Sequence, residues 1–158
     1  MKELTHIDKS GRPKMVDISA KPDTERKAIA KGTVSMKPAT LALIKQGKTK
    51  KGEVLVTAQL AGIIAAKKTP ELIPLCHPIL IDEITVEFEL DEKNSAIEIT
   101  STAKSVGRTG VEMEALTATA VAALTIYDMV KGVDRGMKIA NIRLVEKSGG
   151  KSGKITLE

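Results

Sequence analysis

Two stretches near the middle of the chain alternate apolar and polar residues, and this alternation constrains the fold more than any other feature. Apolar residues fill every second position from 84 to 90, and again at positions 97 and 99. Because successive side chains of a strand point to opposite faces, each stretch predicts a strand with one buried and one wet face. Residues 91–94 form a polar turn between the two stretches. The pair is therefore expected to form a β-hairpin.

The remaining elements follow from helix signals and from weaker strand patterns. Helices are expected at residues 39–46, at 53–68 and at about 111–130, each bounded by proline or glycine. Further strands are expected at residues 27–36 and at about 137–146. The resulting order is strand, helix in two pieces, strand, strand, helix, strand.

This order is that of the ferredoxin-like βαββαβ arrangement, an α+β class in which helices cover one face of an antiparallel sheet. No linker or internal repeat divides the chain, so residues 1–158 are expected to form a single domain. Residues 1–25 are expected to form an extended N-terminal arm. Residues 147–158 are expected to form a flexible basic tail.

Charge and composition narrow the classes of partner. The formal net charge is +5, which favours an anionic partner. Phe88 and Tyr127 are the only aromatic residues, too few for the stacking platforms that bind single-stranded nucleic acid, so a small anionic metabolite fits better. The single cysteine, Cys76, excludes an intrachain disulfide and suits a cytoplasmic protein. No apolar run approaches the roughly 18 residues of a membrane helix, so no membrane partner is expected.

Asp128 is the first residue that asks for a chemical explanation. It follows a nearly apolar stretch close to the C-terminal end of the last helix, where negative charge is disfavoured. Lys131 is one helical turn away and can pair with it. Burial and the helix dipole would raise the pKa of Asp128, whereas Lys131 would lower it. The residue is either an acid/base group or one half of a local ion pair.

His77 lies in a short segment between prolines, where it can face a ligand or serve the structure. Its neighbour Cys76 is either a weak candidate nucleophile or a small core residue. Adjacent residues of an extended chain point apart, and no other Cys/His cluster exists, so a metal site is not expected.

Several cations stand beside glycines and helix ends. Lys51 precedes a helix after a glycine-flanked turn, and Arg108 lies before the last helix, where backbone amides suit a phosphate. Each cation is otherwise an ordinary surface charge. Gly150, Lys151 and Ser152 do not form a phosphate-binding P-loop, because position 145 is Val145 rather than glycine. The tail is either a glycine loop that folds over an anion or a disordered end.

Five segments, taken together, resemble the cyclic pyranopterin monophosphate synthase family. They are MVDIS at 15–19, LIPLCHP at 72–78, GVEMEALT at 110–117, AALTIYDM at 122–129 and KSGGKSG at 147–153. The resemblance extends from about residue 4 to residue 153, and it is the combination of segments that makes it specific. Residues 154–158 match no part of the family pattern.

The resemblance implies a lyase of molybdenum cofactor biosynthesis. Members of the family rearrange 3′,8-cyclo-7,8-dihydroguanosine 5′-triphosphate to cyclic pyranopterin monophosphate and release pyrophosphate. The resemblance also implies a ferredoxin-like fold and a homohexamer, built as a trimer of dimers with active sites between subunits. No redox cofactor is expected, and magnesium could accompany the triphosphate.

The resemblance assigns roles to particular residues. Asp128 matches the catalytic residue, and Lys51 and Lys131 match general acid/base lysines. The substrate-binding positions are Leu75, Cys76, His77, Met113 and Glu114, and further positions near the pocket are Glu112, Lys67, Arg26, Lys21, Lys147 and Arg108. Arg108 stands where many relatives are expected to carry lysine, which keeps the charge but disfavours proton transfer there.

Two other classes of function fit parts of the sequence. A basic RNA-binding module on a ferredoxin-like sheet would show aromatic side chains on exposed strand positions, and Phe88 is the one strand candidate. A non-catalytic oligomeric scaffold would leave Asp128 unexplained.

Overall fold

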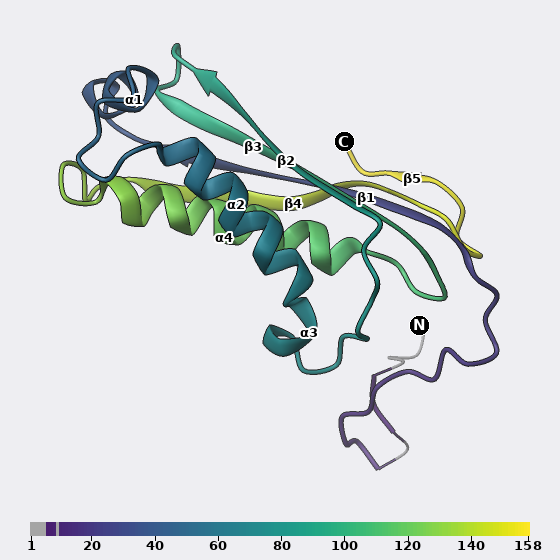
Figure 1. Cartoon of the computed structure of the whole chain (residues 1–158). Helices are drawn as coiled ribbons and strands as arrows, with labels where there is room; N and C mark the ends of the chain where they lie inside the picture. The colour runs from purple at the N-terminus through teal and green to yellow at the C-terminus, as the bar shows by residue number, and fades with distance from the viewer. Residues whose placement is uncertain (1–5, 9) are drawn as a thin grey trace.

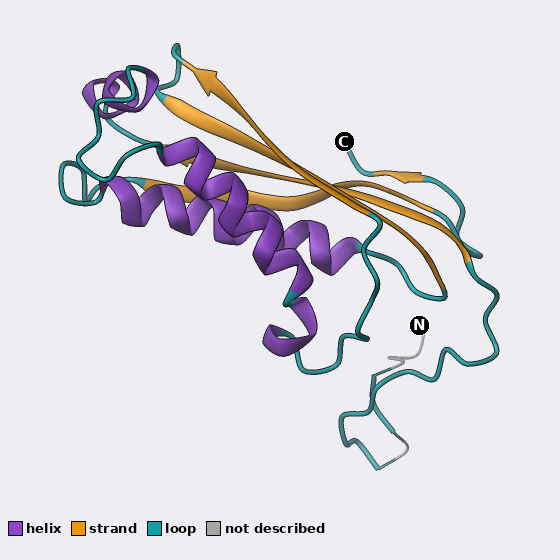
Figure 2. Ribbon diagram, viewed as in Figure 1, coloured by secondary structure: helices purple, strands orange, loops and turns teal. Residues whose placement is uncertain are grey.

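The computed structural model describes residues 6–8 and 10–158, which form one antiparallel sheet covered by helices on one face (Figure 2). The strands are β1 (Thr24–Ser35), β2 (Glu83–Asp91), β3 (Ala96–Gly107), β4 (Lys138–Ser148) and β5 (Ile155–Thr156), and the helices are α1 (Pro38–Lys45), α2 (Val54–Lys67), α3 (Thr69–Leu72) and α4 (Glu112–Val130). The strand order is β2-β3-β1-β4-β5, and every neighbouring pair is antiparallel. The first four strands confirm the ferredoxin-like prediction, and β5 extends it.

The predicted hairpin is β2 and β3, which pair from Glu83 and Lys104 to Asp91 and Ala96. The third strand continues well beyond the predicted alternation, because the buried positions after Ile99 are the small residues Ser101, Ala103 and Ser105. These residues carry little hydrophobic signal. The centre of the sheet, where β1 pairs with β3 over its whole length, is therefore longer than the sequence pattern indicates.

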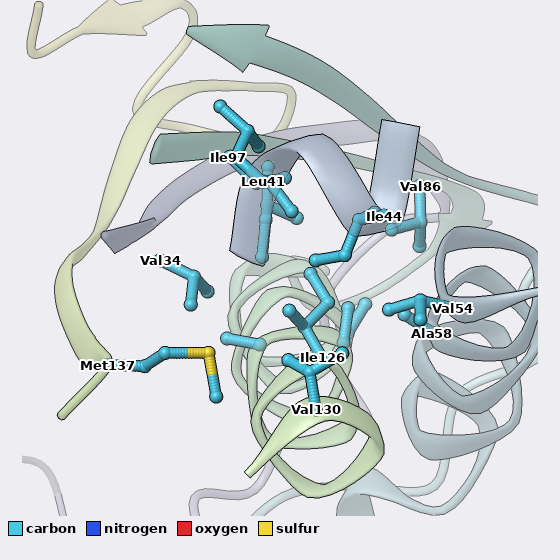
Figure 3. Packing of buried hydrophobic residues seen from close by; sticks show 14 of the residues in the cluster. Val34, Leu41, Ile44, Val54, Ala58, Val86, Ile97, Ile126, Val130 and Met137 are labelled. Carbon is cyan, nitrogen blue, oxygen red and sulfur yellow. The ribbon is translucent and has the colours of Figure 1, made fainter. Parts of the chain in front are cut away.

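The main core lies between the sheet and the two long helices. Figure 3 shows Ile126 and Val130 of α4 within this cluster, beside Val54 and Ala58 of α2. The packing between α2 and α4 is close. A Cβ added to Gly62 would lie 2.9 Å from the backbone oxygen of Ala118. Glycine and alanine thus allow the two helices to approach closely, which a densely packed core with few aromatic residues requires.

Three details of the structure extend or correct the sequence predictions. Helix α2 ends at Lys67, as expected, and a short further helix that the sequence did not predict, α3, begins at Thr69 with Pro70 in its first turn, where no backbone donor is needed. The basic C-terminal segment is not a structureless extension, since it begins within β4 and folds back as β5. In the described part of the arm, residues 6–8 and 10–23, the one pairing is an isolated bridge between Ile7 and Pro13.

A fourth correction concerns α4. This helix is long and apolar enough to cross a membrane by length and composition, with a mean hydropathy of 1.3 over 18 residues. The expectation that no segment reaches that length is therefore wrong. In the structure α4 packs against the sheet and α2, and its buried alanines and Ile126 belong to the core. Its apolar character is accounted for by this packing.

Candidate functional site

The residues to which the sequence assigns a function gather at the two opposite ends of α4. Glu112, Met113 and Glu114 occupy its first turn, whereas Asp128 lies in its last turn and Lys131 caps it. At 1.5 Å per residue, the backbone positions of Glu114 and Asp128 are about 21 Å apart. Figure 1 shows that the loop before α2 approaches one end of α4 and the N-terminal arm lies toward the other. One chain therefore presents two separate groups.

The first group is an ion-paired triad at the C-terminal end of α4. Lys131 Nζ lies 2.7 Å from Asp128 Oδ1, and Lys51 Nζ lies 3.2 Å from Asp128 Oδ2. Lys51 Nζ also donates a hydrogen bond of 2.8 Å to the backbone oxygen of Asp128, one of the carbonyls that a helix end leaves without a partner. The turn that carries Lys51 is bounded by Gly47 and Gly52, both with positive φ.

The triad differs from the sequence expectation in the burial of Asp128. The side chain of Asp128 is 58% exposed, so the expected burial is absent. Hydrogen bonds from Lys131 and then from Lys51 lower the pKa of the Asp128 carboxyl, and the bond to Asp128 raises the pKa of Lys131. The lysine partners thus outweigh burial. At neutral pH the triad holds an ionised carboxylate that can accept a proton beside an ammonium that can donate one.

The second group begins with a cavity of about 260 Å³ at the N-terminal end of α4. Its walls include all five predicted substrate-binding residues, which are Leu75, Cys76, His77, Met113 and Glu114. The segment between α3 and β2 supplies three of them, and the first turn of α4 supplies the other two. His77 Nε2 lies 2.7 Å from the backbone oxygen of Val16, so it also ties the N-terminal arm to the cavity.

Glu114 is the one acid within this cavity wall that is fully buried. Its side chain is 2% exposed, and its Oε2 has no hydrogen-bond partner among the described residues. Burial, assisted by the negative charge of Glu112, raises the pKa of Glu114 to about 7. A carboxyl group that titrates near neutral pH in a cavity is suited to proton transfer.

Cys76 behaves differently from a nucleophile. Burial raises the pKa of its thiol, and the charge of Glu114 raises it further. Because the thiolate is the reactive form, this shift disfavours a nucleophilic role for Cys76. The nucleophile interpretation of this residue loses its support.

A second cavity of about 580 Å³ adjoins the first and is strongly cationic. It shares Thr109, Gly110 and Glu112 with the first cavity, and its cations are Lys21, Arg26, Arg108, Lys147 and Lys151. Four of these five cations are predicted site residues. Lys147 pairs with Glu112, and Arg108 lies 3.5 Å from Asp23. The first turn of α4 adds the positive end of its dipole, so the cavity suits a polyphosphate.

Two differences from the predicted site remain. Lys67 is exposed at the end of α2 and lines neither cavity at the start of α4. Lys151, Ser152 and Thr24 line the cationic cavity but are absent from the predicted set. The glycine-flanked lysine of the tail was the feature of the sequence that could have identified Lys151 and Ser152. The sequence pattern fits both a loop that folds over an anion and a disordered end, so it did not decide between them.

A resident metal has no evident ligand set. Within residues 6–8 and 10–158, no group of three His, Cys, Asp or Glu side chains is close enough to hold an ion. The acids that lie near the cavities, Glu112 and Glu114, face lysine or the protein interior.

Comparison with known proteins places the chain in a family. Residues 15–150 match the model of the MoaC family. A protein of Roseiflexus sp. (strain RS-1) named cyclic pyranopterin monophosphate synthase is 58% identical over 97% of this chain and 97% of its own. Relatives with the same name are 55% identical in Thermomicrobium roseum and 58% identical in Brucella ovis, each over at least 96% of this chain and 92% of the relative. The chain belongs to the MoaC family.

Proposed function

We propose that this protein is a lyase that converts 3′,8-cyclo-7,8-dihydroguanosine 5′-triphosphate to cyclic pyranopterin monophosphate and pyrophosphate, in molybdenum cofactor biosynthesis. One observation carries the proposal from the geometry: a cationic cavity that suits a triphosphate adjoins a cavity with a buried, unpartnered carboxyl group. The similarity to relatives that bear the name of this enzyme, over nearly their whole length, supports it independently.

The cationic cavity accounts for substrate binding and for the leaving group. A triphosphate brings several negative charges, and Arg26, Arg108 and Lys147 provide opposite charges on three different segments. Closing the cyclic monophosphate breaks the bond to the outer two phosphates, whose charge moves to pyrophosphate. Fixed cations that are already oriented stabilise this charge without reorganising.

The acid/base groups account for the ring rearrangement. Opening one ring of the purine and closing the pterin ring requires protons to move to and from nitrogen and carbon. Glu114 exchanges a proton near neutral pH because burial raises its pKa. Their mutual hydrogen bond shifts the pKa of each toward its charged form, so at neutral pH Asp128 is a carboxylate and Lys131 is an ammonium. The carboxylate is thus available to accept a proton and the ammonium to donate one, although the same bond makes each transfer less favourable while it is intact.

These two groups meet on a small substrate only if two copies of the chain contribute to one site. About 21 Å separate Glu114 from Asp128 along α4, more than a proton transfer can span. Val56, Leu60 and Ile64 of α2 are about half exposed or more and recur every four residues, so they form an apolar stripe on one helix face. Leu124 of α4 is equally exposed. We propose that this stripe contacts a second copy, in a homohexamer built as a trimer of dimers with active sites between subunits.

The remaining properties follow from the substrate. The reaction needs no redox cofactor, and any magnesium would arrive with the triphosphate. A nucleotide-derived substrate and a single cysteine favour a cytoplasmic location. The two aromatic rings, Phe88 and Tyr127, pack against the core rather than forming a platform for bases, which disfavours the RNA-binding alternative.

The proposal is tested by incubating the protein with the cyclised triphosphate and measuring pyrophosphate and, after oxidation, a fluorescent pterin. Asp128→Ala and Lys51→Ala are expected to remain folded oligomers and to lower turnover by roughly 10²–10⁴-fold, because each removes part of the acid/base triad.

The matched control is the exposed ion pair of Lys104 and Glu83, whose side chains are 45% and 49% exposed. Lys104→Ala is expected to retain wild-type turnover. Wild-type turnover by Asp128→Ala or Lys51→Ala would remove the triad from the reaction, and the absence of pyrophosphate release by the wild type would overturn the function itself.

A further inference from the structure

The C-terminal segment is the second arm of a β-hairpin. Strand β5 pairs with β4 at Glu146 and Thr156 and at Lys147 and Ile155, and the backbone nitrogen of Leu157 donates a 2.8 Å hydrogen bond to Val145. Ion pairs join the two arms on both sides: Lys154 Nζ lies 2.9 Å from Glu146, and Arg143 pairs with Glu158. Residues 149–153 form the tip, which is therefore held at both of its ends.

The tip lies directly on β1. Gly149 and Gly150 have positive φ values of 103° and 66°. A Cβ at position 149 would collide with the backbone oxygen of Glu25, and one at position 150 would collide with the guanidinium of Arg26. Both positions therefore require glycine, for backbone conformation and for close approach. Arg26 itself is fixed from the other side, because its Nε donates to the backbone oxygen of Gly107 at 3.1 Å.

This packing of the tip against β1 places Lys151 and Ser152 in the wall of the cationic cavity. Lys151, like Lys21 and Arg26 in the same wall, forms no ion pair with a carboxylate among the described residues, whereas Lys147 and Arg108 do. Thr24, across the cavity wall, has a buried hydroxyl oxygen without a hydrogen-bond partner in the described part of the chain. The cavity thus retains one unneutralised ammonium on the tip and one unsatisfied hydroxyl on β1.

We propose that Lys151 and Ser152 bind the outer phosphates of the substrate, and that the β4–β5 hairpin is the element that positions them. The inference rests on the proposed function for the identity of the triphosphate. Thr109, Gly110 and Glu112 line both cavities, whereas Lys151 and Ser152 line only the cationic one. A substrate whose base lies beside Glu114 therefore extends its phosphates toward the tip.

The first experiment measures binding of inorganic tripolyphosphate by titration calorimetry, with pyrophosphate and phosphate as shorter probes. Lys151→Ala is expected to weaken tripolyphosphate binding about tenfold, the usual effect of losing one charge-assisted hydrogen bond, and Lys151→Arg to restore most of it. Ser152→Ala should have a smaller effect of the same sign. Lys93→Ala, in the exposed turn between β2 and β3, makes the same change in net charge and should bind as the wild type does.

The second experiment separates positioning from contact. Leu157→Pro removes the backbone donor that closes the hairpin on Val145, whereas Leu157→Ala keeps it. The proline variant is expected to reproduce part of the Lys151→Ala loss, and the alanine variant is not. In a Lys151→Ala background, Leu157→Pro should cause little further loss, because the residue that it positions is already absent.

The third measurement is turnover of the cyclised triphosphate. Lys151→Ala should raise KM about tenfold with a smaller change in kcat, as expected for a binding contact. If the wild type is active and Lys151→Ala changes neither its KM nor its affinity for tripolyphosphate, the phosphate-binding role of Lys151 is overturned and the proposed function stands. If the wild type binds tripolyphosphate through Lys151 but releases no pyrophosphate, the phosphate-binding role is supported and the proposed function is overturned.

Discussion

Glu114 carries an ionisable carboxyl group into the protein interior with no partner for one of its oxygens. Burial raises its pKa from 4.5 to about 7, and the nearby Glu112 contributes to the same direction. Between these two values the folded protein binds a proton that the unfolded chain has already lost. The free energy of unfolding therefore falls as the pH rises through this window, by up to about 3 kcal/mol at neutral pH.

Replacing Glu114 with glutamine removes this titration and gives the first prediction at this scale. We expect the stability of Glu114→Gln relative to the wild type to increase steadily between pH 4.5 and 7 and to level off above pH 7. Urea unfolding at several pH values measures this difference. Glu87→Gln, at an exposed position of β2, is the control and should show no such rise. A flat difference for Glu114→Gln would mean that the buried acid is ionised without penalty.

The sequence predicts site residues well where spacing or family resemblance identifies them, and poorly where the surroundings decide their chemistry. Asp128 and Lys131 lie three residues apart on a helix, so their ion pair is predictable. Exposure of Asp128 is not, because nearly every side of α4 is apolar in sequence and the pattern does not distinguish the buried face. The isolation of Glu114 depends on the segment around Cys76, which folds over it from a distant part of the chain.

At the scale of elements, the contact between α2 and α4 fixes the distance between the two long helices that cover the sheet. Gly62 lies at the closest approach, where an added Cβ would be 2.9 Å from the backbone oxygen of Ala118 and 3.2 Å from Val86. Backbone atoms cannot move aside as a flexible side chain can. A larger residue there must separate the helices or strain the core.

Gly62→Val is accordingly expected to lower the free energy of unfolding by about 1–3 kcal/mol, the usual cost of overpacking a core. Thermal and urea unfolding provide the measurement. Gly132→Val is the matched control, since an added Cβ at Gly132 meets nothing within 4 Å, and it should change stability far less. Equal losses in the two variants would point to the backbone preference of valine rather than to helix packing.

The predictability of the elements follows the strength of their hydrophobic pattern. Strand β2 is predicted almost to the residue because its apolar positions are large and alternate regularly, and helices α2 and α4 because each is a long apolar segment bounded by glycine or proline. The second half of β3 is missed because its buried positions hold serine and alanine. Strand β5 is missed because it is two exposed residues long and exists through its pairing with β4. Asp134 is also missed: this buried carboxylate accepts the Lys37 N–H at 2.9 Å, which ties α1 to the loop after α4.

At the scale of the whole molecule, the two functional groups lie too far apart along α4 for one chain to bring both of them to the same substrate. If each active site combines the Asp128 end of one copy with the His77 end of another, each copy contributes to two sites. A defect at one end then affects only the site to which that end contributes.

Co-expression of two inactive variants tests this arrangement. A chain with Asp128→Ala retains an intact His77 end, and a chain with His77→Ala retains an intact Asp128 end. Random assembly of equal amounts should combine intact ends at about a quarter of the sites, restoring roughly that share of wild-type turnover. Asp128→Ala mixed with Lys51→Ala is the control, because both changes damage the same end and no pairing repairs it. Mixed oligomers of Asp128→Ala and His77→Ala that stay inactive would place both residues in a site built within one chain, and a rearrangement of α4 and its neighbours would then be needed to bring its two ends together.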